Sequence, residues 1–361
     1  MAVPKLFEPV SFRSVTARNR IVVGPMCQYS ANEGLGDDWH IQHLGARALG
    51  GAGMVITEAA HVSAIGRITP GCLGVYTPEH AALLARLVAA IERGGAVPGI
   101  QLAHAGRKAS TKRPWEGTGA VAPDQGGWTP IGPTGEAFGE GFAAPSAMST
   151  SDIAAVIAQF AASARMAREA GMKVVELHGA HGYLMHSFNS PVSNTRNDSY
   201  GGDLAGRSRM MMETVEAVRA EWPDHLPLFV RLSVVDWMAG GLTLADSVEL
   251  AKRLKATGKV DLIDCSSGGI AAVGPKIPSL HPGYQVPLAD GIRAGAGIAT
   301  GAVGMITSAS HAAEIVGNDR ADLVFVARAV LADPAWPLRA ARELGAPVVL
   351  PPQYQRAVLA A

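Results

Sequence analysis

The sequence predicts a closed barrel of eight parallel strands with helices between them, and three observations support that fold class. Short runs rich in Val, Ile and Leu alternate with longer amphipathic segments, which is the pattern of βαβ units. The short runs are apolar along their whole length, as strands are when both faces of a sheet are covered. There are eight such runs, which favours a (β/α)8 TIM barrel over an open, doubly wound sheet.

Each expected strand is a brief apolar run bounded by Gly, Pro or polar residues. In chain order the strands are expected at residues 20–24, 53–57, 97–102, 173–177, 226–232, 260–264, 297–300 and 322–327. Parallel neighbours cannot be joined by tight turns, so the segments between them must cross back along the barrel.

The expected helices lie between those strands. Residues 79–94 show the clearest pattern, because Leu83, Leu87 and Ile91 recur at helical spacing. Residues 151–171 begin with Ser-Asp and end on Gly, which are start and stop signals of a helix. Further helices are expected at 207–222, 243–258 and 308–317.

One long irregular stretch, residues 111–150, follows the third strand and is rich in Gly, Pro and Ala. Loops of this length are uncommon and are often functional. We expect it to form an excursion over the mouth of the barrel.

Composition supports one large domain. The chain has 361 residues, of which 48% are hydrophobic, and no linker divides it, so residues 1–361 are expected to form a single domain. Its 31 basic and 31 acidic residues balance. Without excess positive charge or a Lys/Arg stripe, nucleic acid is not an expected partner.

The three cysteines indicate a reducing compartment. Cys27, Cys72 and Cys265 form no C-x-x-C pair, so neither a disulfide framework nor a cysteine zinc site is expected. No apolar run reaches the roughly 18 residues that a membrane span needs. The N-terminus lacks a signal-peptide pattern. The cytoplasm is the expected location.

Polar side chains gather where the fourth strand ends, and barrel enzymes place their chemistry at such carboxyl ends. His178 and His181 lie three residues apart, and Tyr183 follows two residues later. Two imidazoles in one turn can direct two N–H donors at a single oxygen, while a phenol beside them can supply a proton. This arrangement suits a site that polarises a carbonyl and protonates a neighbouring carbon.

The last two strand ends indicate a phosphate site. Residues 301–304 can offer backbone N–H groups, and Arg328 adds a guanidinium. Schiff-base chemistry needs a central lysine, and only Lys108 is close. Metal-dependent enolase chemistry needs several carboxylates, and only Glu58 and Asp264 qualify. A phosphate-bearing organic cofactor is therefore expected, and no metal.

The chain resembles the old yellow enzyme family of FMN-dependent ene-reductases, in the branch that contains the xenobiotic reductases and the thermophilic-like enzymes. The resemblance extends from Leu6 to Arg356, essentially the whole chain. Its markers are Pro25-Met26-Cys27-Gln28-Tyr29, residues 101–109, His178-Gly-Ala-His181-Gly-Tyr183, Tyr200-Gly201-Gly202 with Arg207, and residues 300–306.

The resemblance implies a substrate site. By analogy, His178 and His181 donate hydrogen bonds to a substrate carbonyl, Tyr183 protonates the α-carbon, and Tyr29 lines the pocket. Arg356, in a C-terminal tail at about residues 350–361, reaches a neighbouring subunit. The alternatives are a zinc pair or two buried histidines, core tyrosines and a solvated tail.

The resemblance also implies an FMN site. Cys27 lies against the flavin ring, and Gln101 and Arg231 bind its pyrimidine edge; the alternative for Arg231 is a salt bridge to a barrel carboxylate such as Glu176. The family usually has Gly before the arginine of the eighth strand, but this chain has Ala327. A left-handed backbone at that position would disfavour alanine and weaken the cradle. The full expected set is Pro25, Met26, Cys27, Ala59, Gln101, Arg231, Val303, Gly304, Ala327 and Arg328.

The implied activity is hydride transfer from NADPH or NADH through FMN to the activated C=C bond of an α,β-unsaturated carbonyl compound, with quinones and nitro compounds as further substrates. The implied assembly is a homodimer or a dimer of dimers. Two other functions stay open: a flavin-free barrel enzyme, such as an aldolase or a metal-dependent hydrolase, and a non-catalytic ligand-binding barrel.

Overall fold

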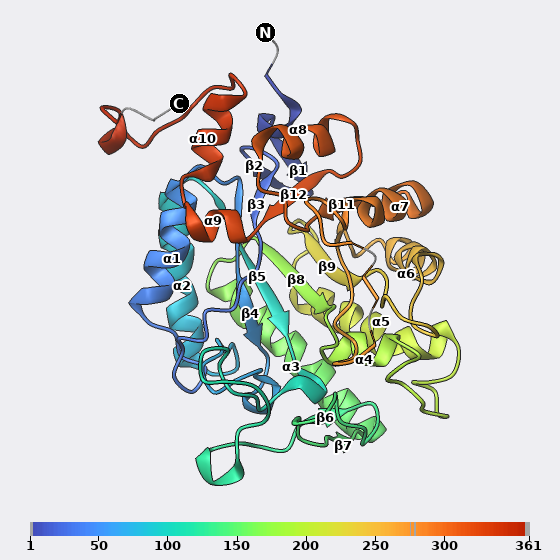
Figure 1. The fold of residues 1–361 in the computed structure, drawn as a ribbon. Helices are drawn as coiled ribbons and strands as arrows, with labels where there is room; N and C mark the ends of the chain where they lie inside the picture. The colour runs from blue at the N-terminus through green and yellow to red at the C-terminus, as the bar shows by residue number, and fades with distance from the viewer. Residues whose placement is uncertain (1–2, 275, 278, 358–361) are drawn as a thin grey trace.

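The expected barrel is present. In the computed structural model, which describes residues 3–274, 276–277 and 279–357, eight parallel strands form one closed sheet (Figure 1). The strands follow one another in chain order around the barrel, and the last pairs with the first. They are β3 (Ile21–Val23), β4 (Met54–His61), β5 (Val97–Ala103), β8 (Val174–Gly179), β9 (Leu228–Ser233), β10 (Leu262–Ser266), β11 (Ala299–Ala302) and β12 (Leu323–Val326).

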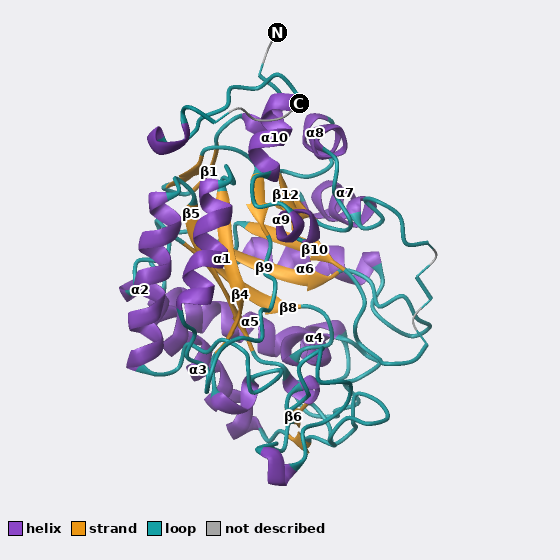
Figure 2. Cartoon of the chain, turned by 60° about the vertical axis from the view of Figure 1, so that its left-hand side comes forward, coloured by secondary structure: helices purple, strands orange, loops and turns teal. Residues whose placement is uncertain are grey.

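Helices cover the outside of the barrel, as Figure 2 shows in purple around the orange strands. Short 3-10 turns add to them at η1 (Lys5–Phe7), η2 (Ala64–Gly66), η3 (Gly106–Lys108), η4 (Pro123–Gln125) and η5 (Pro352–Tyr354). The helices are α1 (Asp38–Leu49), α2 (Pro78–Arg93), α3 (Thr150–Glu169), α4 (Leu184–Asn189), α5 (Leu204–Glu221), α6 (Leu244–Ala256), α7 (Val286–Ala296), α8 (Ala309–Gly317), α9 (Arg328–Ala332) and α10 (Trp336–Glu343). None of the described helices combines the length and the apolar character that crossing a bilayer requires.

Five of these helices were not expected from the sequence: α1, α4, α7, α9 and α10. The buried face of α1 carries His40, His43 and Arg47 as well as Leu44, so its apolar period is weak. Helix α7 contains Pro at its start and two glycines, which lower helix propensity. The other three are short.

A β-hairpin closes the amino end of the barrel. Strands β1 (Val10–Phe12) and β2 (Val15–Ala17) pair antiparallel, and the sequence analysis did not predict them. The ring of Phe12 packs edge-on against Phe229 inside the barrel, with centroids 5.2 Å apart. The interior cluster there contains Val22, Met54, Ile56, Val174, Phe229, Leu262, Leu323 and Phe325. This cluster is an apolar floor below the site.

Side chains on the inner face of the barrel change character along each strand. Because alternate residues face inward, three successive inner positions pass from the floor to the carboxyl end. On three adjacent strands they are apolar, then charged, then imidazole or hydroxyl: Val174, Glu176 and His178 on β8; Phe229, Arg231 and Ser233 on β9; and Leu262, Asp264 and Ser266 on β10. A charged layer therefore separates the floor from the mouth.

The excursion between β5 and α3 lies at the carboxyl end of the barrel, as expected (Figure 1). It carries β6 (Ile131–Gly132) and β7 (Ser146–Ala147), which pair in parallel. Arg113 in this segment donates from Nε to the Tyr29 carbonyl at 3.0 Å. The indole of Trp128 donates to the Ile65 carbonyl at 2.8 Å. These contacts fasten the excursion to the loops that follow β3 and β4.

Candidate active site

Three side chains from the end of β8 and the loop after it lie together at the carboxyl end of the barrel. The ring centroids of His178 and His181 are 5.1 Å apart, and that of Tyr183 lies 4.8 Å from His178 and 6.4 Å from His181. The rings stand nearly perpendicular to one another, at 81° to 89°. Both imidazoles and the phenol can therefore reach one small molecule.

The charge states of these groups follow from their burial. Burial, and next the positive charge of Arg231, hold the pKa of His178 and of His181 well below its usual value. Burial raises the pKa of Tyr183 well above its usual value. At physiological pH the imidazoles are thus neutral and the phenol is protonated. All three groups carry a proton to donate without any buried charge.

Neighbouring hydrogen bonds orient the imidazoles. Nδ1 of His178 accepts from the Ala180 backbone N–H at 3.3 Å, which leaves its proton on Nε2. Nε2 of His181 lies 2.7 Å from the Ser266 hydroxyl, and the His181 backbone N–H donates to the Ser233 hydroxyl at 2.8 Å. Residues of β9 and β10 thereby fix a loop that follows β8.

Cys27 and Tyr29, which follow β3, pack beside Tyr183. The three belong to one small cluster with Ile68 and Cys72 at its buried centre. Burial raises the pKa of the Cys27 thiol well above its usual value, so this residue is a thiol rather than a thiolate. The backbone of Tyr29 has φ of 53°, in the left-handed region, so its ring position depends on the surrounding contacts.

The remaining residues expected on β3 to β5 lie at the same end. Pro25 and Met26 precede Cys27 and are half-buried. Ala59 and Gln101 are buried and pair directly across β4 and β5. The Gln101 amide donates to Glu176 Oε1 at 2.7 Å, so its N–H2 group points into the charged layer.

Arg231 pairs with a barrel carboxylate and also faces a cavity. Its Nε lies 3.0 Å from Asp264 Oδ2, so a barrel carboxylate does pair with it, but Glu176 is not the one. Burial raises the pKa of Asp264, and Arg231 opposes that shift. Arg231 also lines a cavity at the carboxyl end of the barrel.

That cavity, of about 320 Å³, brings together five of the residues expected to hold the cofactor: Arg231, Val303, Gly304, Ala327 and Arg328. Arg328 is exposed at the cavity, and its guanidinium has no hydrogen bond or ion pair with the part of the chain that the structure describes. A guanidinium free to form paired hydrogen bonds suits a phosphate. The donor set therefore fits the phosphate end of FMN.

Backbone geometry resolves the concern about Ala327. Gly304 has φ of 122°, a conformation that side chains disfavour, and a Cβ there would stand 3.0 Å from Gln285 Nε2. Ala327, in contrast, has φ of −119° and ψ of −86°, which lies outside the left-handed region. The glycine that the cradle needs is thus Gly304, and alanine at 327 carries no left-handed strain.

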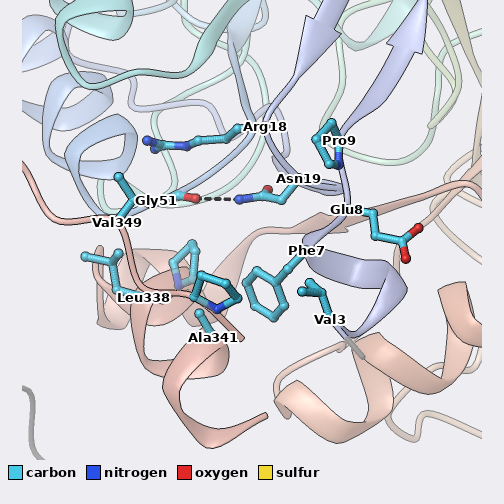
Figure 3. A pocket seen from close by; sticks show the side chains of 12 residues that line it. Val3, Phe7, Glu8, Pro9, Arg18, Asn19, Gly51, Leu338, Ala341 and Val349 are labelled. Carbon is cyan, nitrogen blue, oxygen red and sulfur yellow. Dashed lines mark hydrogen bonds between the residues drawn. The ribbon is translucent and has the colours of Figure 1, made fainter. Parts of the chain in front are cut away.

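A second cavity, of about 310 Å³, lies at the opposite end of the barrel (Figure 3). Phe7, Leu338 and Val349 are among its apolar lining residues. Two of its polar side chains are already bound to the backbone, since Arg18 donates to the Ala52 carbonyl at 3.0 Å and Asn19 to the Gly51 carbonyl at 2.9 Å. These contacts indicate a structural role.

Arg356 is not brought to the other site residues of its own chain. The preceding tail residues, 349–354, lie against Arg18, Gly94 and Gly95, which precede β3 and β5. The tail therefore starts from the amino end of the barrel, and Arg356 is exposed there. Any contribution of Arg356 to a site must be made in another subunit.

The sequence analysis missed several buried polar residues near the site. Ser233 and Ser266 contact His181, and His186 and Asp236 form a buried pair behind it. Serines at strand ends carry no distinctive spacing, so the sequence offered no signal for them. For His186, the sequence showed only that a polar residue follows Tyr183 closely.

The described residues disfavour the two flavin-free enzymes, the aldolase and the metal-dependent hydrolase. The Lys108 ammonium donates to the His181 carbonyl at 2.9 Å and to the Gly269 carbonyl at 3.3 Å, and so holds a loop instead of standing free for a Schiff base. Among the described residues, no three His, Cys, Asp or Glu side chains converge in a way that could bind a metal ion.

Known proteins are similar to this chain in sequence and fold. An "NADPH dehydrogenase" of Geobacillus sp. (strain WCH70) is 46% identical over 353 residues, which cover 97% of this chain and 98% of that protein. A solved complex of 2-naphthoyl-CoA reductase with 2-naphthoyl-CoA superposes with a TM-score of 0.84 at 26% identity; it covers 94% of this chain, which spans 52% of that protein. Morphinone reductase in complex with tetrahydroNAD (N189A mutant) superposes with a TM-score of 0.77 at 24% identity, over 97% of this chain and 93% of that one, and shows the shared fold.

Comparison with protein families matches residues 5–346 to the NADH:flavin oxidoreductase / NADH oxidase family. The match covers nearly the whole barrel and agrees with the cavity described above. It confirms the expected enzyme class, the FMN cofactor and the nicotinamide reductant. The chain therefore belongs to the NADH:flavin oxidoreductase / NADH oxidase family and is an FMN-dependent oxidoreductase of the old yellow enzyme type.

Proposed function

We propose that this protein is an ene-reductase, which reduces the activated C=C bond of α,β-unsaturated carbonyl compounds with NAD(P)H as the reductant. The observation that carries the proposal is the convergence of two neutral imidazoles and one protonated phenol at the carboxyl end of the barrel. Donors of this kind can hold a carbonyl oxygen and supply a proton to the carbon beside it.

FMN, when bound, would supply the hydride chemistry between NAD(P)H and the β-carbon of the alkene. Val303, Gly304, Ala327 and Arg328 hold its phosphate in this proposal, on the strength of the cavity that they line. Arg231 favours negative charge on the reduced ring. The proposal also assigns Pro25, Met26, Cys27, Ala59 and Gln101 to the ring.

In the reaction, His178 and His181 donate hydrogen bonds to the substrate carbonyl and draw electron density from its β-carbon. The His178 proton is on Nε2, since Nδ1 is an acceptor. We assign the His181 proton to Nδ1, because the Ser266 hydroxyl can donate to Nε2 at 2.7 Å. The Tyr183 hydroxyl gives its proton to the α-carbon, and Tyr29 lines the pocket beside it.

Cys27 acts in this proposal as an uncharged neighbour of the ring and not as a nucleophile. The raised pKa of its thiol supports that role, because a thiol is a poor nucleophile. Quinones and nitro compounds remain further candidate substrates, since both place an electron-poor group next to a hydrogen-bond acceptor.

The assembly that we propose is a homodimer, or a dimer of dimers, in the cytoplasm. Arg356 would enter the site of the partner subunit, and its exposed position at the amino end of its own barrel supports a role between subunits. Three cysteines without a disulfide agree with a reducing compartment.

Replacing Tyr183 tests the proposed acid. We expect Tyr183→Phe to slow the oxidation of reduced enzyme by cyclohexenone by about 100-fold or more, the usual contribution of a positioned acid. Reduction of the flavin by NADPH should keep its rate, since no proton from Tyr183 is needed there. Anaerobic stopped-flow absorbance measures the two half-reactions separately.

Tyr76→Phe is the matched control, because Tyr76 donates to the Glu33 carbonyl at 2.9 Å, away from the residues that line the site. It should leave both half-reactions unchanged. An equal loss in both half-reactions of Tyr183→Phe would exclude the assigned acid. Wild-type enzyme that oxidises NADPH but reduces no enone would exclude ene-reduction itself.

A further inference from the structure

We propose that His186 and Asp236 are positioning residues, which set the backbone turn at His181–Gly182 and through it the places of His181 and Tyr183. The inference rests on the proposed function for its activity readout. It assigns a role to a buried polar pair that contacts neither the cavity nor any of the expected site residues through its side chains.

The turn at His181–Gly182 needs support from its surroundings. His181 has φ of 60° and Gly182 has φ of 75°, so two successive residues are left-handed. This conformation is disfavoured for histidine and persists only where neighbouring groups hold it. The turn is also crowded, because a Cβ on Gly182 would stand 2.1 Å from the Gly269 carbonyl oxygen.

Buried side chains satisfy three consecutive polar groups of this turn. The His181 N–H donates to Ser233 Oγ at 2.8 Å, and the His181 carbonyl accepts from Lys108 Nζ at 2.9 Å. The Gly182 N–H donates to His186 Nδ1 at 2.8 Å. The third contact sits closest to Tyr183, which is the next residue in the chain.

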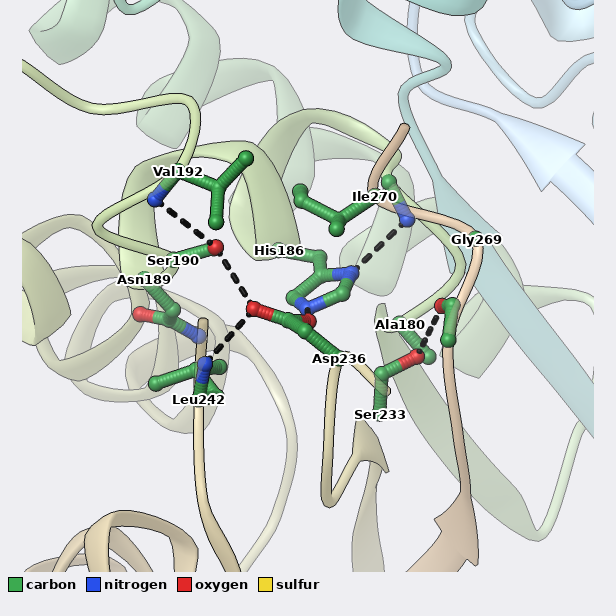
Figure 4. Close-up of polar contacts among 12 residues, drawn as sticks. Ala180, His186, Asn189, Ser190, Val192, Ser233, Asp236, Leu242, Gly269 and Ile270 are labelled. Atoms are coloured by element: carbon green, nitrogen blue, oxygen red, sulfur yellow. Dashed lines mark hydrogen bonds and ion pairs between the residues drawn. The ribbon is translucent and has the colours of Figure 1, made fainter. Parts of the chain in front are cut away.

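His186 is in turn fixed by Asp236, as Figure 4 shows. His186 Nε2 lies 2.9 Å from Asp236 Oδ1. Asp236 Oδ2 accepts from Ser190 Oγ at 2.7 Å and from the Leu242 N–H at 2.7 Å. His186, Ser190 and Asp236 are each 0% exposed, so the pair is sealed from solvent.

The direction of these bonds defines one tautomer of His186. Nδ1 must be the acceptor, since the Gly182 N–H can only donate. The ring proton is therefore on Nε2 and points to the Asp236 carboxylate. Burial alone raises the pKa of Asp236, but the hydrogen bonds from His186, Leu242 and Ser190 hold it below its usual value, so the carboxylate is ionised and accepts.

Asp236→Asn keeps the shape of the side chain but reverses the direction of its hydrogen bond with His186. In Asp236→Asn the carboxamide can still accept from Ser190 and Leu242, which leaves its NH2 group facing His186 Nε2. His186 then takes the other tautomer and presents an N–H to the Gly182 N–H. Two donors face each other, and the turn must move.

The experiment compares Asp236→Asn, His186→Leu and His186→Asn with wild-type holoenzyme. The Asn oxygen at 186 falls near the place of Nδ1 and can accept from Gly182, so His186→Asn is the rescue variant. The matched control is His80→Leu: His80 is a buried histidine whose Nδ1 accepts from the Thr77 N–H at 3.2 Å, at the start of α2 and outside the site.

We expect Asp236→Asn and His186→Leu to lower kcat for cyclohexenone reduction by about 100-fold, since a small misplacement of reacting groups has that effect. FMN content should be unchanged, and His186→Asn should recover most of the rate. His80→Leu should lose thermal stability and keep kcat. In hydrogen–deuterium exchange, peptides covering residues 179–184 should exchange faster in the first two variants only.

Unchanged exchange in residues 179–184 of Asp236→Asn would overturn the inference, whatever the activity. Loss of activity in strict proportion to loss of folded protein, with no rescue by His186→Asn, would also overturn it and leave a purely structural pair. Because the exchange measurement needs no substrate, it stands even if the wild-type enzyme fails to reduce enones, which would defeat the proposed function alone.

Discussion

The Lys108 side chain is the most unusual charged group near the site. Its amine lies between the carbonyls of His181 and Gly269, 4.4 Å from the ring centre of Phe138 and 5.2 Å from that of Tyr183. Phe138 belongs to the excursion, so the Lys108 side chain connects the excursion to the turn at His181–Gly182. Burial, and next the charge of Arg107, lower the pKa of Lys108 to about 8.

This shift predicts a pH dependence of stability. An unfolded lysine titrates near pH 10.4, so between pH 8 and that value the unfolded chain binds more protons than the folded one. The free energy of unfolding therefore rises with pH across this window and receives no such gain below it. Relative to Lys108→Met, wild type should gain up to about 3 kcal/mol between pH 7 and pH 10.5.

Urea unfolding of both proteins at several pH values measures the difference and cancels the titration of other groups. Curves that run parallel from pH 7 to pH 10.5 would contradict a depressed lysine. Lys108→Arg is a useful companion, because it keeps the charge throughout and should show no rise.

The side chains to which we assign the chemistry could be named from the sequence. His178, His181, Tyr183 and Arg231 stand in compact motifs at strand ends, so their approach in space follows from the barrel. Ser266 and Asp236 were not predictable, because each acts through a partner far away in the sequence and belongs to a residue type that is common in loops.

Among the elements, the loops after β11 and β12 show how backbone conformation can decide a binding site. Gly304 requires φ of 122°, whereas Ala327 has φ of −119°. The departure from the usual glycine at 327 therefore has no left-handed backbone cost, and the sequence alone could not establish this because it holds no dihedral angles.

The two positions give opposite predictions. Gly304→Ala introduces a side chain into a left-handed position against Gln285 and should weaken FMN binding by about tenfold or more, a cost of roughly 1–2 kcal/mol. Ala327→Gly should leave FMN affinity within about twofold and lower the free energy of unfolding by up to about 1 kcal/mol. Fluorescence titration of apoprotein with FMN and urea unfolding measure the two effects. Tighter FMN binding by Ala327→Gly would show that the cradle does need glycine.

The strands were predictable because continuous apolar runs are diagnostic of buried parallel sheet. Helix α1 and the hairpin of β1 and β2 were not, for two different reasons. Helix α1 buries His40, His43 and Arg47, which interrupt an apolar period. The hairpin has three-residue strands, too short for an alternating pattern to be recognised.

At the scale of the whole molecule, the C-terminal tail and the candidate site lie at opposite ends of the barrel. Arg356 starts from the amino end while the site opens at the carboxyl end, so a functional Arg356 requires a second chain. Arg356→Ala should raise KM for cyclohexenone several-fold and spare flavin reduction by NADPH.

Mixing subunits tests whether Arg356 acts between chains. Tyr183→Phe lacks the acid and Arg356→Ala lacks the arginine, but in a mixed dimer one site holds Tyr183 and receives Arg356 from its neighbour. When equal amounts of the two variants are refolded together, about half of the dimers are mixed, and one of the two sites in each mixed dimer is complete. About one quarter of all sites should therefore show the wild-type KM. Failure to recover any such sites, with dimers shown by sedimentation, would assign Arg356 to a solvated tail.

The apolar floor formed around Phe12 and Phe229 also limits how small molecules can reach the site. A barrel closed at its base is entered only from the carboxyl end, so under the proposed function NAD(P)H and the alkene bind there in turn, and the first product leaves before the second substrate binds. Double-reciprocal plots of the steady-state rate should then give parallel lines. An excess of either compound should inhibit the reaction, because it occupies the site that the other compound needs.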